Sequence, residues 1–129
     1  MPQAVADELA QGLIQGISLP NLTSLSWTKL CPVPSSILIP DLPNLGAGER
    51  ESLSLAMTIP DSLVILDDAL ARGYARQLNI PITGTLGVIL KGKQSGYLDA
   101  IAPLLDELDV LNFRLAPATR AAVLKLANE

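Results

Sequence analysis

The stretch Leu63-Val64-Ile65-Leu66-Asp67-Asp68-Ala69-Leu70-Ala71-Arg72 decides the fold, because an apolar run ends there at two adjacent carboxylates. Residues 63–66 are four large aliphatic residues, two of them β-branched, which is typical of a parallel strand buried on both faces. In open α/β sheets, ligands bind beyond the carboxyl ends of such strands. Asp67 and Asp68 are therefore the first candidates for site residues.

The segment that follows, residues 69–78, has the spacing of a helix and carries Arg72 and Arg76 one turn apart. A structural role is open for each of these charged residues. Aspartate readily caps the N-terminus of a helix, so one of the two carboxylates can cap this one. The arginines can pair with Asp68 and other surface acids as i, i+4 neighbours.

Helical and strand-like segments alternate along the rest of the chain. Helices are expected at 2–16, 46–60, 69–78, after the turn at 84–87 as far as 94, at 97–110 and at 117–128. Strands or extended pieces are expected at 24–28, 63–66, 79–83 and 113–115. This alternation predicts an α/β fold with a parallel sheet covered by helices on both faces. A length of 129 residues predicts a single domain, 1–129.

The composition limits the compartment and the core. Hydrophobic residues make up 49% of the chain but aromatic residues only 3%, so the core must be aliphatic. No apolar run approaches the roughly 20 residues that cross a bilayer. The first residues carry Asp7 and Glu8 and no basic residue, which is unlike a signal peptide. We therefore expect a cytoplasmic protein with no membrane partner.

Histidine is absent and Cys31 is the single cysteine, which excludes the usual zinc sites and every histidine-based triad. Any metal must then be held by oxygen ligands, which favours Mg²⁺ or Mn²⁺. The net charge of −4 argues against broad electrostatic capture of nucleic acid. Only Lys29 is basic before Arg50, however, so a local basic patch stays possible in the later part of the chain.

Two further acids extend the candidate site. Glu8 lies on the first expected helix and Glu49 in the first turn of the next, so a parallel sheet can bring both to one crevice with Asp67 and Asp68. Clustered carboxylates repel one another unless a cation offsets them, and a bound divalent ion suits phosphoester hydrolysis. The structural alternatives are a solvated helix face for Glu8 and a helix-dipole contact for Glu49. The turn at 84–87 is a weaker candidate for a phosphate-binding loop.

Six segments of the chain resemble the PIN-domain-like family, in particular its prokaryotic branch of nucleic-acid-binding PIN proteins. They are residues 2–9, 48–56, 66–72, 75–87, 103–108 and 112–115. The most specific part is the spacing from Asp67-Asp68 to Gly84-Thr85-Leu86-Gly87. This resemblance implies a three-layer α/β/α sandwich with a central parallel sheet. It also implies a ribonuclease that uses Mg²⁺ or Mn²⁺, in some members as the toxin of a toxin–antitoxin pair.

Carried over by position, the resemblance matches Glu8 and Glu49 to the acids of two helices, and Asp67 or Asp68 to the acid after the later strand. Our first hypothesis is that Glu8, Glu49, Asp67 and Asp68 hold the metal and activate water. In that hypothesis Arg50, Arg72 or Arg76 steers the phosphate backbone of the RNA. The chain departs from the family at its start, because the usual first strand and its aspartate are absent from it. We therefore expect an N-terminally truncated PIN-like domain with impaired activity, and as the alternative a non-catalytic association or nucleic-acid-binding protein. An exposed strand edge further predicts a homodimer. In the non-catalytic alternative, the partner is an antitoxin-like protein or a second copy of the chain.

Overall fold

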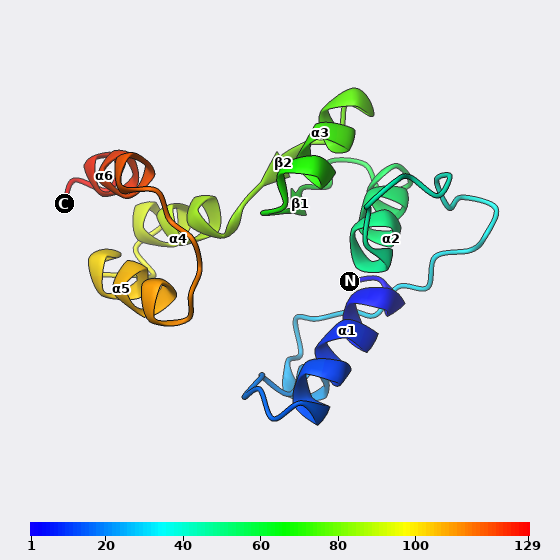
Figure 1. Cartoon of the computed structure of the whole chain (residues 1–129), viewed down its shortest axis with the longest axis horizontal. Coiled ribbons are helices and arrows are strands. Elements are labelled where there is room, and N and C mark those ends of the chain that lie inside the picture. Colours follow the sequence, from blue (N-terminus) through cyan, green and yellow to red (C-terminus); the bar gives the residue numbers. More distant parts are fainter. The chain divides into compact units, whose positions relative to one another are not determined.

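The computed structural model describes residues 1–129 and is α/β, with six α-helices and a small parallel sheet, consistent with a PIN-like α/β/α fold (Figure 1). Its residues pack into two compact units, Met1–Ile82 and Thr83–Glu129. The single-domain assignment for 1–129 stays a prediction. No helix is both long enough and apolar enough to cross a membrane.

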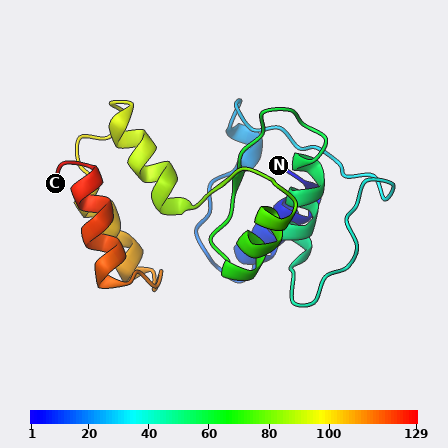
Figure 2. The same cartoon turned by 90° about the horizontal axis from the view of Figure 1, so that it is seen from above.

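The first unit contains three helices, a short 3₁₀ turn and the strands. In chain order these are α1 (Gln3–Ile14), η1 (Leu22–Ser24), α2 (Ala47–Ala56), β1 (Val64–Ile65), α3 (Ala69–Gln77) and β2 (Ile82–Thr83), whose last residue begins the second unit. The start of α1 lies beside α2 in both views (Figures 1 and 2). The helices around 69–78 and 46–60 were predicted correctly in position, although α2 ends four residues before Pro60.

The strand predicted at 63–66 is buried on one face only, so the prediction of burial on both faces is wrong. Val64 and Leu66 are 9% and 6% exposed, whereas Leu63 and Ile65 are each 59% exposed. Successive side chains of a strand point to opposite faces, so the burial alternates in this way when only one face is covered. The sheet has just two strands, β1 and β2, and Val64 N donates to Pro81 O at 3.0 Å.

The covered face of β1 belongs to an aliphatic core shared with α2 and α3. Leu53 of α2 and Ala71 and Ala75 of α3 are fully buried in it. The remaining buried members are Ile39, Leu45, Val64, Leu66 and Ile80. The buried members are all aliphatic, as expected, and Tyr74 packs against them as a partly buried residue.

The predicted strand at 24–28 is wrong, because side chains there bond to the local backbone instead. Asn21 Oδ1 accepts from Thr23 N at 3.0 Å, which caps the 3₁₀ turn η1. Thr28 Oγ1 donates to Leu22 O at 3.0 Å and to Leu25 O at 2.8 Å. Asparagine and threonine often offer the backbone such local partners, which compete with strand pairing.

The second unit is built from α4 (Thr85–Gln94), α5 (Ala102–Val110) and α6 (Pro117–Leu126). Its buried centre is Ile101, Leu105, Val123 and Ala127. Arg120 of α6 forms ion pairs with Asp106 and Asp109 of α5. The predicted helix over 97–110 begins only at Ala102, where Pro103 occupies a first-turn position that tolerates proline.

The side chain of Glu129 accepts two backbone hydrogen bonds at the N-terminus of α5 in the second unit. Its Oε1 accepts from Ile101 N at 2.8 Å and its Oε2 from Ala102 N at 3.1 Å. Lys93 Nζ lies 3.4 Å from Oε1. The amides of Ile101 and Ala102, with a smaller contribution from Lys93, hold the pKa of the Glu129 carboxyl below its ordinary value although partial desolvation opposes the shift.

This lowered pKa predicts an acid-sensitive second unit. A carboxyl whose pKa is lower in the folded than in the unfolded state stabilises the fold above the unfolded value of about 4.3. That stabilisation is lost as the pH falls through the pKa that the carboxyl has in the folded state. The Tm of the wild type should therefore fall more steeply between pH 6 and pH 3 than that of Glu129→Gln. A difference in Tm between the two proteins that does not change with pH would contradict this.

Candidate acidic site

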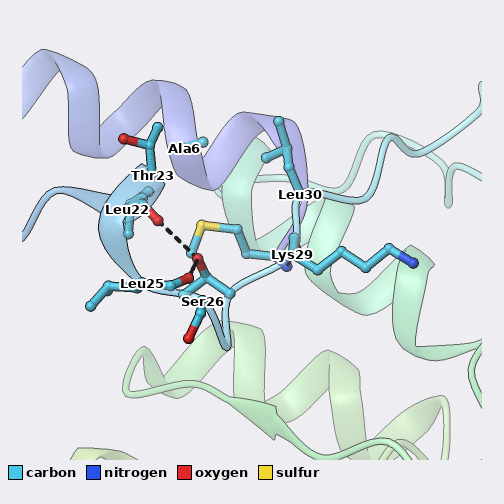
Figure 3. A pocket seen from close by; sticks show the side chains of 9 residues that line it. Ala6, Leu22, Thr23, Leu25, Ser26, Lys29 and Leu30 are labelled. Atoms are coloured by element: carbon cyan, nitrogen blue, oxygen red, sulfur yellow. Dashed lines mark hydrogen bonds between the residues drawn. The ribbon is translucent and has the colours of Figure 1, made fainter.

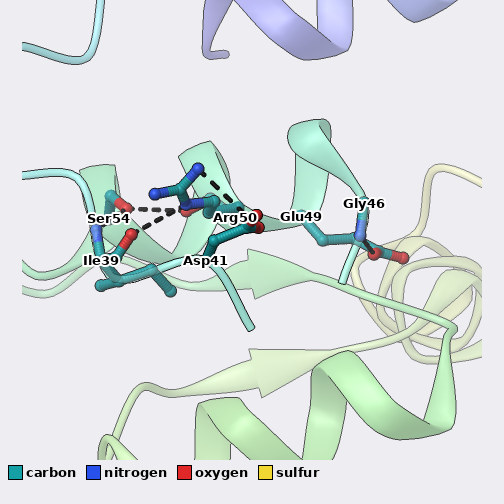
Figure 4. Close-up of polar contacts among 6 residues, drawn as sticks. All are labelled: Ile39, Asp41, Gly46, Glu49, Arg50 and Ser54. Carbon is teal, nitrogen blue, oxygen red and sulfur yellow. Dashed lines mark hydrogen bonds and ion pairs between the residues drawn. The ribbon is translucent and has the colours of Figure 1, made fainter. Parts of the chain in front are cut away.

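Two of the four predicted acids lie at the N-terminal end of α2, although they come from different helices. Glu8, on α1, places Oε1 3.0 Å from Gly48 N and accepts its hydrogen bond. Glu49 folds back so that its Oε2 accepts from Gly46 N at 2.7 Å (Figure 4). Both carboxylates thus meet amides that have no partner inside the helix, at the end where the helix dipole favours negative charge.

The other two acids, Asp67 and Asp68, follow β1 as the sequence predicted. Asp68 Oδ1 accepts from Ala71 N at 2.8 Å and caps α3, which confirms the structural alternative for this residue. Asp67 is exposed next to it. Asp68 therefore stabilises the helix directly after the strand.

The carboxylates do not fit a divalent metal centre as they lie in this structure. No three acidic or cysteine side chains gather in a way that would hold an ion. Glu8, Glu49 and Asp68 each use an oxygen to accept from a backbone amide. Oxygen-ligand sites depend on the number and charge of converging ligands, so the arrangement provides too few for tight binding of Mg²⁺ or Mn²⁺.

The three arginines predicted to face RNA differ in their surroundings. Arg50 Nε donates to Ile39 O at 2.8 Å, and its Nη1 lies 3.9 Å from Asp41 Oδ1 (Figure 4). Arg72 Nη1 donates to Leu66 O at 3.0 Å, so its guanidinium supports the end of β1. Arg76 is exposed in the last turn of α3.

Two important residues of α2 were missed by the sequence reasoning. Ser54 is fully buried, and its hydroxyl accepts from Ile39 N at 3.0 Å while donating to Arg50 O at 2.7 Å (Figure 4). Glu51 Oε2 accepts from Ala4 N, the second residue of α1, at 2.9 Å. Pro2 at the N-cap of α1 has no side-chain acceptor, which indicates that α1 needs an outside partner but does not identify Glu51. Ser54 gave no comparable signal.

A pocket of about 420 Å³ lies between α1 and residues 22–30 (Figure 3). Its walls are mainly apolar, with Ala6, Leu22 and Leu25 among them, and Lys29 on its rim. Nearby on the chain, Trp27 is 80% exposed. No carboxylate of the candidate site lines this pocket, so it is unsuited to the predicted hydrolysis.

The turn at 84–87 is explained by packing. α4 begins at Thr85, with Gly84 as its N-cap. A Cβ on Gly87 would lie 2.2 Å from Thr83 Oγ1, so only glycine leaves room for that hydroxyl. This close approach favours the structural interpretation of the turn over a phosphate-binding loop.

The fold and the acids together define an α/β protein with a small parallel sheet and carboxylates at helix N-termini and a strand end. A family model described as a PIN domain matches residues 1–129, so the chain belongs to the PIN domain family. No curated protein and no solved structure matches the chain. Family membership confirms the resemblance seen in the sequence and indicates a nuclease-type function, which in PIN domains is generally dependent on a divalent metal.

Proposed function

We propose that this chain is a PIN domain of the ribonuclease type, directed at RNA phosphodiester bonds with Mg²⁺ or Mn²⁺, and that hydrolysis is impaired in the chain as it stands. The observation that carries the proposal is the meeting of Glu8 and Glu49, from two helices, at the N-terminal end of α2. The family match over 1–129 supports the reaction class. The impairment follows because no third acid joins this pair, and because Glu8, Glu49 and Asp68 each accept from a backbone amide.

RNA cleavage by the full chain tests this function. A fluorophore-labelled single-stranded RNA, incubated with millimolar Mn²⁺, should be cut slowly, and EDTA should stop the cutting. Glu8→Gln and Glu49→Gln keep an oxygen that accepts the same amide hydrogen bond, so the fold should persist. Cleavage should nevertheless fall about tenfold or more, as it does when metal-site groups are altered.

Glu107→Gln is the matched control, because Glu107 is exposed on α5 in the second unit. It removes the same charge and should leave the rate unchanged. Cleavage that persists in EDTA, or that is equal in Glu49→Gln and wild type, would contradict a nuclease site at α2. No cleavage in any metal would leave the second candidate below as the function.

For RNA contact, the exposure of Arg76 supports a role in binding the phosphate backbone. Arg50 and Arg72 are proposed to contribute as well, although each already uses one N–H on a carbonyl. A guanidinium has five N–H donors, so donors are left over for phosphate.

The second candidate is non-catalytic association, with another copy of the chain or with an antitoxin-like protein in the cytoplasm. The apolar side chains left exposed in the first unit favour it: Trp27 is 80% exposed and Ile14 77% exposed. Exposed apolar surface of this kind commonly marks a protein interface. Sedimentation velocity at micromolar concentration distinguishes the two states, and a compact monomer would exclude the homodimer.

A further inference from the structure

Both helices that meet at the acidic site begin without a capping side chain. The N-cap of α1 is Pro2 and that of α2 is Gly46, and neither provides a side-chain acceptor. The first four amides of a helix have no partner within it, so they need acceptors from elsewhere. Glu49 serves the amide of Gly46 itself, but the amide of Gly48, the second residue of α2, still needs a partner.

Each helix receives that acceptor from the other. Glu8 of α1 accepts from Gly48 N at 3.0 Å, and Glu51 of α2 accepts from Ala4 N at 2.9 Å. Ala4 and Gly48 are both the second residue of their helix. The exchange is therefore reciprocal, and the pairing of 4 with 51 and 8 with 48 runs the two helices antiparallel. Each carboxylate also lies at the favourable end of its partner's dipole.

Gly48 permits this approach. A Cβ at position 48 would lie 2.7 Å from Glu8 Oε2 and 2.8 Å from Oε1, closer than real contacts allow. Any side chain there would push the Glu8 carboxylate away from the amide. The lack of a side chain at Gly48 therefore leaves room for the Glu8 carboxylate to reach the amide.

We propose that Glu8 and Glu51 form a reciprocal carboxylate clasp that holds α1 against α2 without any metal. In this inference Glu8 stabilises the metal-free fold. A glutamate whose role is to bind an ion among other acids has the opposite effect, because it adds repulsion when the ion is absent. The clasp is tested without measuring ribonuclease activity.

The first test is thermal unfolding of the full chain in EDTA. Glu8→Ala and Glu51→Ala should each lower Tm by about 3–6 °C, the range expected when a charged helix cap is lost. Asp7→Ala is the matched control, since Asp7 is an exposed neighbour that contacts only Gln3 within α1. It should change Tm by less than about 2 °C. An unchanged or raised Tm in Glu8→Ala would overturn the clasp.

The double variant Glu8→Ala/Glu51→Ala adds a measure of coupling. Both residues hold the same pair of helices, so the loss of one should weaken the contribution of the other. The combined fall in Tm should therefore be smaller than the sum of the two single falls. Strict additivity would mean that each carboxylate caps its partner helix separately, which contradicts a shared clasp.

The second test replaces Gly48 with alanine and measures Tm with and without Glu8. In the Glu8→Ala background, Gly48→Ala should raise Tm by about 3–5 °C, because alanine is the better helix former. With Glu8 present that gain should be cancelled or reversed, since the new methyl group displaces the carboxylate. An equal rise in both backgrounds would show that Glu8 does not depend on the Gly48 amide and would overturn the proposal.

Discussion

Replacing Leu53 with alanine is expected to lower the free energy of unfolding by about 2–5 kcal/mol. Leu53 is fully buried on α2, where it packs in the cluster that includes Val64 and Leu66 of the β1 region and Ala71 of α3. Removing its isobutyl group leaves a cavity that this packed cluster fills only in part. Chemical denaturation of the full chain, followed by circular dichroism, measures the change.

Two control variants separate cavity formation from the substitution itself. Leu63→Ala makes the same change at a site that is 59% exposed and should cost less than about 1 kcal/mol. Leu53→Met nearly conserves the volume and should cost less than about 1.5 kcal/mol. Equal losses in Leu53→Ala and Leu63→Ala would contradict the assignment of Leu53 to the core that positions the site helix.

Local sequence patterns predicted most of the fold because they depend on near neighbours. The apolar run at 63–66 gave the position of β1, and Asp68 followed by helical spacing gave the start of α3. What covers a strand depends on distant residues, which explains why the one-sided burial of Leu63 and Ile65 was not predicted. At 24–28, Thr28 and Asn21 form short-range bonds that override the strand-like composition.

The candidate site was predictable in its residue types and less so in its contacts. The spacing from Asp67-Asp68 to the Gly-Thr-Leu-Gly turn identified the family. The sequence alone did not indicate that Glu8 accepts from Gly48 or that Glu51 accepts from Ala4, because these contacts join residues more than 35 positions apart. Such pairing is set by how α1 docks on α2, and this docking is a tertiary property.

The second large expected effect, after the loss of stability in Leu53→Ala, concerns the affinity of the chain for a divalent metal ion. A full set of converging carboxylates would hold a divalent ion strongly, and affinity falls steeply as ligand number and charge decrease. Here no three acids gather, and Glu8, Glu49 and Asp68 each accept from an amide. We therefore expect the chain to bind Mn²⁺ with a Kd no lower than about 10⁻⁴ M.

Whether the carboxylates of this chain bind a divalent ion only weakly is tested most directly by titrating the full chain with Mn²⁺. Electron paramagnetic resonance measures the free ion. We expect weak binding that saturates only toward millimolar Mn²⁺, is reduced in Glu49→Gln and is unchanged in Glu107→Gln. Stoichiometric binding at micromolar Mn²⁺ would contradict it, because the carboxylates would then have to leave their backbone partners and converge on the ion.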